Sequence, residues 1–405
     1  MSGTAATPMM AQYLAMRKSL PADVILLYRL GDFYEMFFED AKTAAPILNV
    51  ALTKRGGTPM CGVPYHAAQA YLARLLKAGK RVAIAEQTSD PVPGKLVQRE
   101  ISRILSPGSI DDLTLLDDQR PNYLAAVFRS GKSIGLACIE HTTGEFVLAE
   151  FQETPLLLDE LARLDPSELL VSDVQAGEFG QLRNSLAYDG YPFLPEHAHS
   201  LLKEHFGVHS LDGFGCASAP AATGAAGAAL HYLIYQLRRP CGHLRPPKIR
   251  ENSACVLIDA ASQRNLDLVE SRSGKPHTLL GVLDRTATPM GARLLRDWIL
   301  HPLRDIGTLL QRQDLIAAFM AEPFLLSKCR ESLKGIRDIE RTTSRLSQGS
   351  GNARDLLSLA TSLSHVPNLR EDLESVLAAC PLRIMLKPST ERNSGASRVC
   401  SACFM

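Results

Sequence analysis

The 405-residue sequence lacks the features that mark membrane and secreted proteins. It has no run of the ~18 to 20 apolar residues that a membrane span requires. The first residues, MSGTAATPMM, contain neither the basic nor the apolar segment of a secretory signal. The nine cysteines are spread thinly, so we expect most of them to be reduced and buried. A cytoplasmic, globular protein is therefore predicted.

The common catalytic and metal-binding signatures are also missing. The pattern HExxH and a GxGxxG after a strand do not occur. Residues 131–133 (Gly-Lys-Ser) match the end of a phosphate-binding loop, but Ala126 stands where such a loop begins, so we expect a hairpin turn. Cys400 and Cys403 form a single pair, whereas a structural zinc ion needs four ligands. We therefore expect no catalytic residue, no nucleotide site and no metal site.

The net charge of +1 excludes a strongly basic or acidic protein, but one stretch is locally basic. Residues 54–103 hold nine Lys and Arg against three acidic residues. Such a local excess is suited to contact with phosphates.

Residues 1–117 are predicted to form a compact α/β domain. Turn and cap signals separate its elements, with turns at Gly31-Asp32 and over LTKRG (52–56), and with Gly79 at the end of a helix. The expected helices cover 9–20, 35–48 and 66–79, and the expected strands cover 24–28, 81–87 and the region 99–108.

Residues 118–250 are predicted to form a second α/β domain. Apolar and polar residues alternate over 123–151 between two turn signals, which predicts an antiparallel meander of three strands. Residues 156–172 and 221–237 are expected to be helical. Several prolines follow, and they place the end of this domain near residue 250.

Helical patterns dominate residues 251–383, for example over 259–271, 290–303 and 306–320. The final residues, 384–405, are basic and rich in serine, and they show no periodicity. We expect this aberrant tail to be disordered.

The segment GDFYE, residues 31–35, follows an expected strand and sets Phe33 two positions from Glu35. Residues i and i+2 of an extended segment project to the same side, so an aromatic ring and a carboxylate are presented together. A ring can wedge between base steps of DNA, at a cost that is lowest where pairing is already faulty. Taken alone, the pair also fits simple packing beside a charge at a helix start.

Several longer segments resemble the MutS family of mismatch repair proteins. In the first domain these are TPMM (7–10), YRLGDFYEMFFEDA (28–41), LTKRGGTPMCGVPYHA (52–67), YLARLLKAGKRVAIAEQ (71–87) and RILSPGS (103–109). Further segments are LDGFG (211–215), LIDAASQRNLDL (257–268) and LLGVLDRTATPMGARLLRDWILHPLRD (279–305). The resemblance covers residues 7 to 380.

The resemblance implies a mismatch-recognition domain, an RNase H-like connector domain and the start of an all-α core of lever helices. Phe33 would be the stacking wedge and Glu35 the hydrogen-bonding acid. Lys54 and Arg55 would either contact the DNA backbone or lie on a solvated surface. Tyr65 and His66 could help to shape the same surface, but we expect them to serve in the core or in helix capping. The implied partners are double-stranded DNA with mismatches or small loops, a second subunit, and a downstream MutL-type factor, in the nucleoid-associated cytoplasm.

The family continues into a clamp and an ATPase that uses ATP and Mg²⁺, and this sequence does not reach them. A frameshift, a premature stop or an assembly edge would each produce such a chain. We therefore expect no cofactor, no ATP hydrolysis and poor dimerisation. We also expect apolar side chains of the helical region to be exposed, among them Leu294, Leu295, Trp298 and Ile299.

Three other interpretations remain open from the sequence. The RNase H-like domain could act as a nuclease, which would require two or three converging carboxylates. The connector could serve as a protein-interaction scaffold whose affinity for DNA is incidental. The chain could also be a broken gene product without a cellular role.

Overall fold

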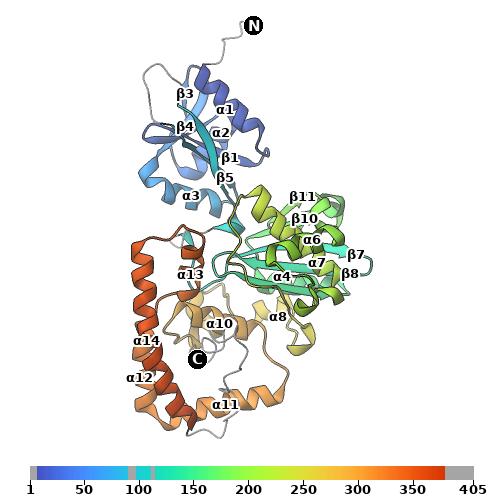
Figure 1. Ribbon diagram of the computed structural model, residues 1–405, viewed down its shortest axis with the longest axis vertical. Coiled ribbons are helices and arrows are strands. Elements are labelled where there is room, and N and C mark those ends of the chain that lie inside the picture. Colours follow the sequence, from blue (N-terminus) through green and yellow to red (C-terminus); the bar gives the residue numbers. More distant parts are fainter. Residues whose placement is uncertain (1–6, 90–96, 111–114, 379–405) are drawn as a thin grey trace.

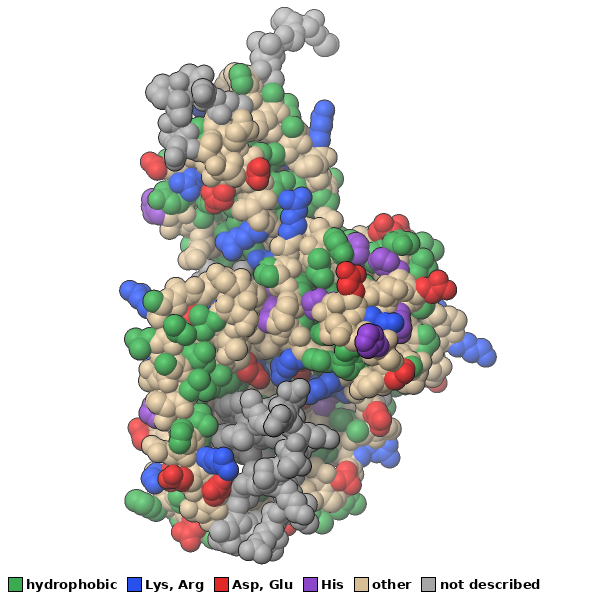
Figure 2. Space-filling view, viewed as in Figure 1, with side chains coloured by type: hydrophobic (Ala, Val, Ile, Leu, Met, Phe, Trp, Pro, Cys, Tyr) green, Lys and Arg blue, Asp and Glu red, His purple; other side chains and the backbone are tan. Residues whose placement is uncertain are grey.

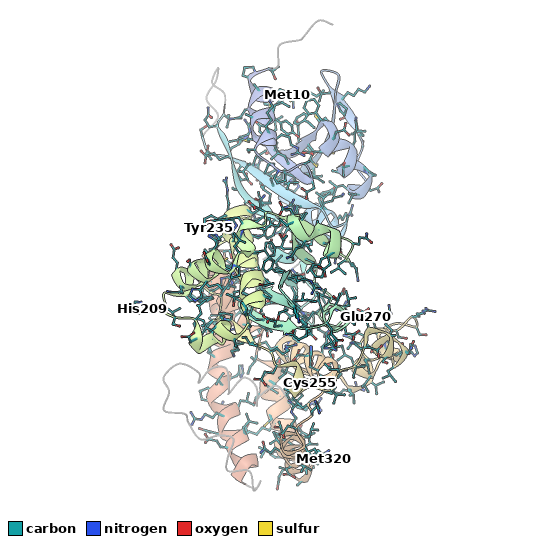
Figure 3. All side chains as sticks on the ribbon, turned by 90° about the vertical axis from the view of Figure 1, so that its right-hand side faces the viewer. Met10, His209, Tyr235, Cys255, Glu270 and Met320 are labelled. Atoms are coloured by element: carbon teal, nitrogen blue, oxygen red, sulfur yellow. The ribbon has the colours of Figure 1, made fainter. Side chains whose placement is uncertain are left out.

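The computed structural model describes residues 7–89, 97–110 and 115–378. The chain forms a first sheet domain, a second sheet domain and a helical region, which follow one another along the molecule (Figure 1). Met10 in the first domain and Met320 in the helical region lie toward opposite ends (Figure 3). No described helix combines the length and apolar character needed to cross a membrane. The tail 384–405, with Cys400 and Cys403, lies outside the described residues.

The first sheet domain contains six strands in the order β3-β4-β2-β1-β5-β6. Only the β1–β5 pair is parallel. The elements are α1 (Pro8–Lys18), β1 (Val24–Leu30), β2 (Phe33–Phe37), α2 (Phe38–Leu48), β3 (Thr53–Arg55), β4 (Thr58–Pro64), η1 (Tyr65–Ala67), α3 (Ala68–Lys77), β5 (Arg81–Gln87), β6 (Arg99–Leu105) and η2 (Pro107–Ser109).

The two faces of this sheet are covered unequally. Helices α2 and α3 pack on one face, where alternate residues of the central strands, such as Leu27 and Met36, are fully buried. Helix α1 covers part of the other face, which we call the α1 face. There the ring of Tyr13 meets Phe37 edge-on, with centroids 5.0 Å apart. Phe33 lies farther along the same face and is 47% exposed.

Two sequence predictions for this domain were wrong. The predicted helix from residue 35 begins only at Phe38, because β2 hydrogen-bonds with β1 on one side and β4 on the other. Residues 52–56 were predicted as a turn, but Thr53–Arg55 is an edge strand paired with β4. Helical spacing and strand pairing compete for such short segments, and the neighbouring strands decide the outcome.

The second sheet domain also contains six strands, in the order β11-β10-β7-β8-β9-β12. The expected meander is present, and the parallel strands β10 and β11 extend it, as in the RNase H-like fold. The elements are β7 (Tyr123–Ser130), β8 (Ser133–Glu140), β9 (Glu145–Phe151), α4 (Thr154–Leu164), β10 (Glu168–Ser172), η4 (Asp173–Gln175), α5 (Ala176–Phe179), β11 (Ser185–Tyr188), η5 (Tyr191–Phe193), α6 (Pro195–Phe206), η6 (Asp212–Phe214), η7 (Cys216–Ser218), α7 (Pro220–His231), η8 (Tyr232–Gln236) and β12 (Lys248–Ile249).

Helix α7 is rich in Ala and Gly because it packs very closely on the sheet. A β-carbon on Gly135 of β8 would lie 2.0 Å from the backbone of Ala221, so only glycine permits this approach. Helix α4 packs on the opposite face, where Leu157 and Leu161 cover the sheet.

In this domain, the prediction of a helix over 156–172 was correct for its first half and wrong for its second half. It ends at Leu164, and Glu168–Ser172 is strand β10, buried along its whole length. A fully buried parallel strand shows no alternation of apolar and polar residues, so the sequence pattern did not reveal it.

The helical region follows, and it confirms the predicted change to helices. Its elements are η9 (Asn252–Ala254), α8 (Ala260–Asn265), η10 (Lys275–His277), α9 (Leu279–Leu283), α10 (Pro289–Leu300), α11 (Ile306–Ala321), α12 (Pro323–Lys334), α13 (Ile339–Ser347) and α14 (Ala353–Ala378). Five of these helices, α8, α9, α10, α11 and α13, are capped by the side chain of the preceding residue, which is Asp259, Thr278, Thr288, Asp305 or Asp338.

This region has a thin core. Its buried apolar cluster consists of Met290, Cys329, Ile336 and Leu369. On the face seen in Figure 2, hydrophobic side chains lie over the outer surface of α14. The exposed apolar residues are not those predicted: Leu294, Leu295, Trp298 and Ile299 are half-buried, because α10 packs within the molecule. Exposure falls instead on the following helices, at Ile306, Met320, Phe324 and Leu357.

Polar contacts join the three parts. Between the two sheet domains, buried Arg81 pairs with Asp23 and donates to the Tyr232 hydroxyl (3.3 Å), which donates to Glu168 (2.5 Å). The helical region is attached by buried Arg341, which donates to the backbone carbonyl oxygens of residues 117 and 120 and lies 3.6 Å from Glu140.

Candidate nucleic-acid interface

Phe33 is presented by a tight hairpin. Strand β1 ends at Leu30, the chain turns through Gly31 with φ +57°, and β2 starts at Phe33 directly opposite Leu30. The glycine is suited to this left-handed conformation, which other residues adopt only with strain. The ring of Phe33 is 47% exposed, an unusual placement for a phenylalanine in a sheet. An accessible aromatic ring therefore stands at the end of the hairpin.

Glu35 lies beside Phe33 on the α1 face, as the i, i+2 spacing predicts. Strand register sets Gly62 of β4 directly opposite Glu35. A methyl group on Gly62 would lie 3.6 Å from Glu35 Cγ and 3.9 Å from Phe33 Cδ1. The ring and the carboxylate thus flank a small space that a glycine leaves open.

Arg55 completes this cluster. It is the last residue of β3, and its Nη1 lies 2.9 Å from Glu35 Oε2. The arginine side chain is 49% exposed, whereas the side chain of Glu35 is only 12% exposed. Partial burial raises the pKa of Glu35, and the positive charge and hydrogen bond of Arg55 oppose this shift. The net result is a pKa of Glu35 above its ordinary value.

Lys54 lies apart from this cluster, although it is adjacent in sequence. Arg55 pairs with Thr58 and Lys54 with Pro59 across the same two strands. Neighbouring residues of a strand point to opposite faces, so Lys54 faces away from Glu35. The structure therefore brings together three of the four predicted site residues, Phe33, Glu35 and Arg55, and separates the fourth.

Tyr65 and His66 were predicted to serve in the core or in helix capping, and this prediction was wrong. Both side chains are exposed, and no side-chain bond caps the short helix η1 that they begin. The guanidinium group of Arg29 stacks 3.6 Å from the ring centre of Tyr65. The cation–π contact holds the arginine in place, and the ring of Tyr65 stays 44% exposed.

The basic stretch 54–103 divides into two groups. Arg81 and Arg99 are buried and satisfied within the protein, Arg81 by Asp23 and Arg99 by the carbonyl oxygen of Arg29 at 2.6 Å. Lys54, Arg55, Arg74, Lys77 and Arg103 remain exposed. The charge available to a polyanion is therefore smaller than the sequence count indicates.

The structure gives no support to a nuclease site. Among the described residues, no group of three or more His, Cys, Asp or Glu side chains could hold a metal ion. Buried acids of the second sheet domain are instead engaged in structural contacts. Glu140 accepts hydrogen bonds from Thr142 and Thr143, and Glu160 is 3.2 Å from His301.

A cavity of about 1240 Å³ lies where the two sheet domains and the helical region meet. Basic residues such as Arg120 and Arg245 line it together with acids such as Glu145 and Asp297. A site for an anion would be lined mainly by positive groups, whereas this cavity has both charges. The cavity is also not lined by Phe33, Glu35 or Arg55.

Gly62 is the part of the cluster that sequence reasoning missed. Its position opposite Glu35 follows from the β2–β4 register, which no local pattern specifies. The available signal was a glycine within a strand-like run, TPMCGVP, because such a glycine marks a close approach to another group.

Comparisons with known proteins match all three parts of the chain. Sequence profiles of MutS domain I, MutS domain II and MutS domain III match residues 7–114, 122–245 and 261–391. Curated relatives named DNA mismatch repair protein MutS include those of Symbiobacterium thermophilum (41% identity over 392 residues) and Myxococcus xanthus (41% over 390). A third, from Syntrophobacter fumaroxidans, is 40% identical over 384 residues. The alignments cover 90 to 92% of this chain but only 42 to 45% of each relative, so the chain spans less than half the length of these proteins.

Proposed function

Because this chain belongs to the MutS family and carries its domains I, II and III, we propose that it binds duplex DNA and recognises mispaired or unpaired bases. The observation that carries the proposal is the pairing of an exposed Phe33 with a half-buried Glu35 on the α1 face.

In this proposal, Phe33 inserts between base steps at the defect. A wedge must unstack bases, which costs a few kcal/mol and costs least where pairing is already faulty. The hairpin holds the ring outside the core, so insertion requires no unfolding of the sheet. Discrimination then arises from the ease of deforming the DNA, as in other indirect readout.

Glu35 makes the hydrogen bond to the displaced base, in the space above Gly62. A carboxylate near phosphates is repelled unless it is protonated or accepts a hydrogen bond. The raised pKa of Glu35 favours the protonated arrangement, since burial disfavours its charged form. Arg55 contributes positive charge to the same surface, and Lys54 adds charge on the other side of the strand.

The wider role is part of the same proposal. The names of the relatives place them in DNA mismatch repair, and we propose that this chain acts on nucleoid DNA in the cytoplasm, with a MutL-type factor downstream. The three matched domains do not include an ATPase, so we propose that residues 1–405 alone bind no ATP or Mg²⁺ and dimerise poorly. ATP turnover by the pure chain would contradict this.

The test is fluorescence anisotropy of the purified chain on a short duplex with one G·T mismatch or one unpaired thymine, against the matched duplex, at low and physiological salt. We expect tighter binding to the mismatched duplex. Phe33→Ala should weaken that binding about tenfold, as expected for loss of one base–aromatic stack, and abolish the preference.

The control is Phe324→Ala, which removes an 84% exposed phenylalanine from α12 in the helical region. It should leave both affinities unchanged. Equal binding of both duplexes by the unaltered chain would refute recognition and leave only charge-driven affinity.

A scaffold role for the second sheet domain is a further candidate. Tyr191 and Tyr235 are both 58% exposed there, and aromatic residues are enriched in protein interfaces. Tyr235 lies on the part of this domain nearest the first domain (Figure 3). If this role is correct, binding of a repair partner is lost in Tyr235→Ala and retained in Phe33→Ala.

A further inference from the structure

We propose that Arg55 acts as a latch on Glu35, binding the carboxylate in the DNA-free protein and moving to a DNA phosphate when a duplex enters. This inference rests on the proposed function, because it describes how the same site is controlled. It assigns Arg55 a positioning role beyond that of an ordinary backbone contact.

The contact geometry supports a latch. Arg55 Nη1 donates to Glu35 Oε2 at 2.9 Å and leaves the rest of its guanidinium group available. Arginine can pair with carboxylates and phosphates through the same planar array of donors, so the two ligands compete for it. A phosphate backbone close to Phe33 would therefore draw Arg55 away from Glu35.

The surroundings allow Arg55 to move. Strand β3 is the edge of the sheet, and all three of its residues are exposed. It is followed by Gly56 and Gly57, whose φ values are +56° and +84°. Movement of the arginine side chain therefore disturbs no buried packing, whereas Glu35 is held on β2 between two paired strands.

Arg55 is the principal charge acting on Glu35. Opposite Glu35 on β4 stands Gly62, and on β1 stands Tyr28, whose ring lies 4.8 Å from the guanidinium group of Arg99. The hydroxyl of Tyr28 donates to Gln12 of α1. Release of Arg55 therefore leaves Glu35 without its ion-pair partner, facing the polyanion and ready to engage a base.

The consequence is a measurable coupling in DNA binding. In the free protein, Glu35→Gln breaks the ion pair and frees Arg55 for phosphate. If the latch opens on binding, this substitution tightens binding to matched duplex more when Arg55 is present than when it is absent. If the ion pair persists in the complex, it contributes equally to the free and the DNA-bound protein. Glu35→Gln then changes the affinity by the same factor whether Arg55 is present or absent.

The experiment is a double-mutant cycle on matched duplex with the full chain, using Glu35→Gln, Arg55→Ala and their combination. We expect a coupling of about two- to fivefold in affinity, the range of a partly exposed ion pair. Arg55→Lys should retain part of the coupling, since it keeps the charge but not the planar donors.

Lys54→Ala is the matched control, because it removes the same charge from the same strand on the opposite face. Both single substitutions should reduce the salt dependence of binding by a similar amount, but the cycle with Lys54→Ala should show no coupling.

The outcomes separate the two proposals. A preference for mismatched DNA without Arg55–Glu35 coupling overturns the latch alone. Coupling without a preference that depends on Phe33 overturns mismatch recognition and supports the latch. A chain that binds neither duplex at low salt overturns both.

Discussion

The two sheet domains and the helical region bury their apolar side chains to very different extents. Strand β10 is buried at all five positions, and Leu148 of β9 is fully inaccessible. In the helical region the buried apolar cluster has four members, while Phe324, Ile306, Met320 and Leu357 are between 69 and 84% exposed. The sheets thus carry their own cores, whereas the helices depend on polar attachments.

Those attachments are made by buried arginines. Arg341 is 2% exposed, and Arg293 is 9% exposed and pairs with Asp338 at 2.6 Å. A buried charge is costly to desolvate, and removing its partner leaves that cost uncompensated. The helical region is therefore expected to respond strongly to changes at a few polar residues and weakly to changes in its exposed apolar ones.

The largest expected difference in the free energy of unfolding is between alanine substitutions at two leucines. Leu148→Ala should lower the free energy of unfolding by about 3 to 4 kcal/mol, because it leaves a cavity in the sheet core. Leu357→Ala on α14 should change it by less than about 0.5 kcal/mol, since that side chain is 69% exposed. Urea denaturation measures both, and a cost at Leu357 similar to that at Leu148 would show that α14 is covered in solution.

The attachment at Arg341 should give the next largest effect. Arg341→Ala leaves Glu140 without its nearby positive charge and two carbonyl oxygens without a donor, at a cost of about 3 kcal/mol. Limited proteolysis should then cleave the helical region while the sheet domains remain protected. Arg337→Ala, at an exposed position in the same region, should leave the pattern unchanged.

The smallest effect should be a pH dependence at the junction of the second sheet domain and the helical region. Burial and the nearby charge of Arg250 lower the pKa of His301. Hydrogen bonds to Asp297 (2.9 Å) and Glu160 (3.2 Å) outweigh these effects, so the pKa of His301 is raised. Protonated His301 therefore stabilises the folded state fully below its unfolded pKa, and this stabilisation is lost as pH rises through the folded pKa.

We accordingly expect the helical region to lose stability as pH rises from the ordinary histidine pKa of about 6.5 through the raised pKa of the folded state. Thermal unfolding followed across that range would measure the loss. His301→Gln should remove this pH dependence, and His209→Gln, at an exposed histidine labelled in Figure 3, should retain it.

At the candidate site, some features follow from the local sequence and others only from pairing between distant strands. The i, i+2 spacing of Phe33 and Glu35 in an extended segment was enough to predict that they share a face. It could not reveal the contact of Glu35 with Arg55, twenty residues away, or the open position at Gly62. Those depend on the register of β2, β4 and β3, which is set by pairing between strands and by the turn at Gly56 and Gly57.

The sequence by itself determined the features that arise from local chemistry. Apolar alternation and turn residues specified the meander over 123–151, and side-chain caps such as Thr288 and Asp305 mark where helices begin. Tertiary structure alone decided that residues 35–37 and 168–172 are strands. These segments fit helical and extended patterns alike, and hydrogen bonds to strands far along the chain select the extended form. The same long-range pairing decided which acids, bases and rings face one another.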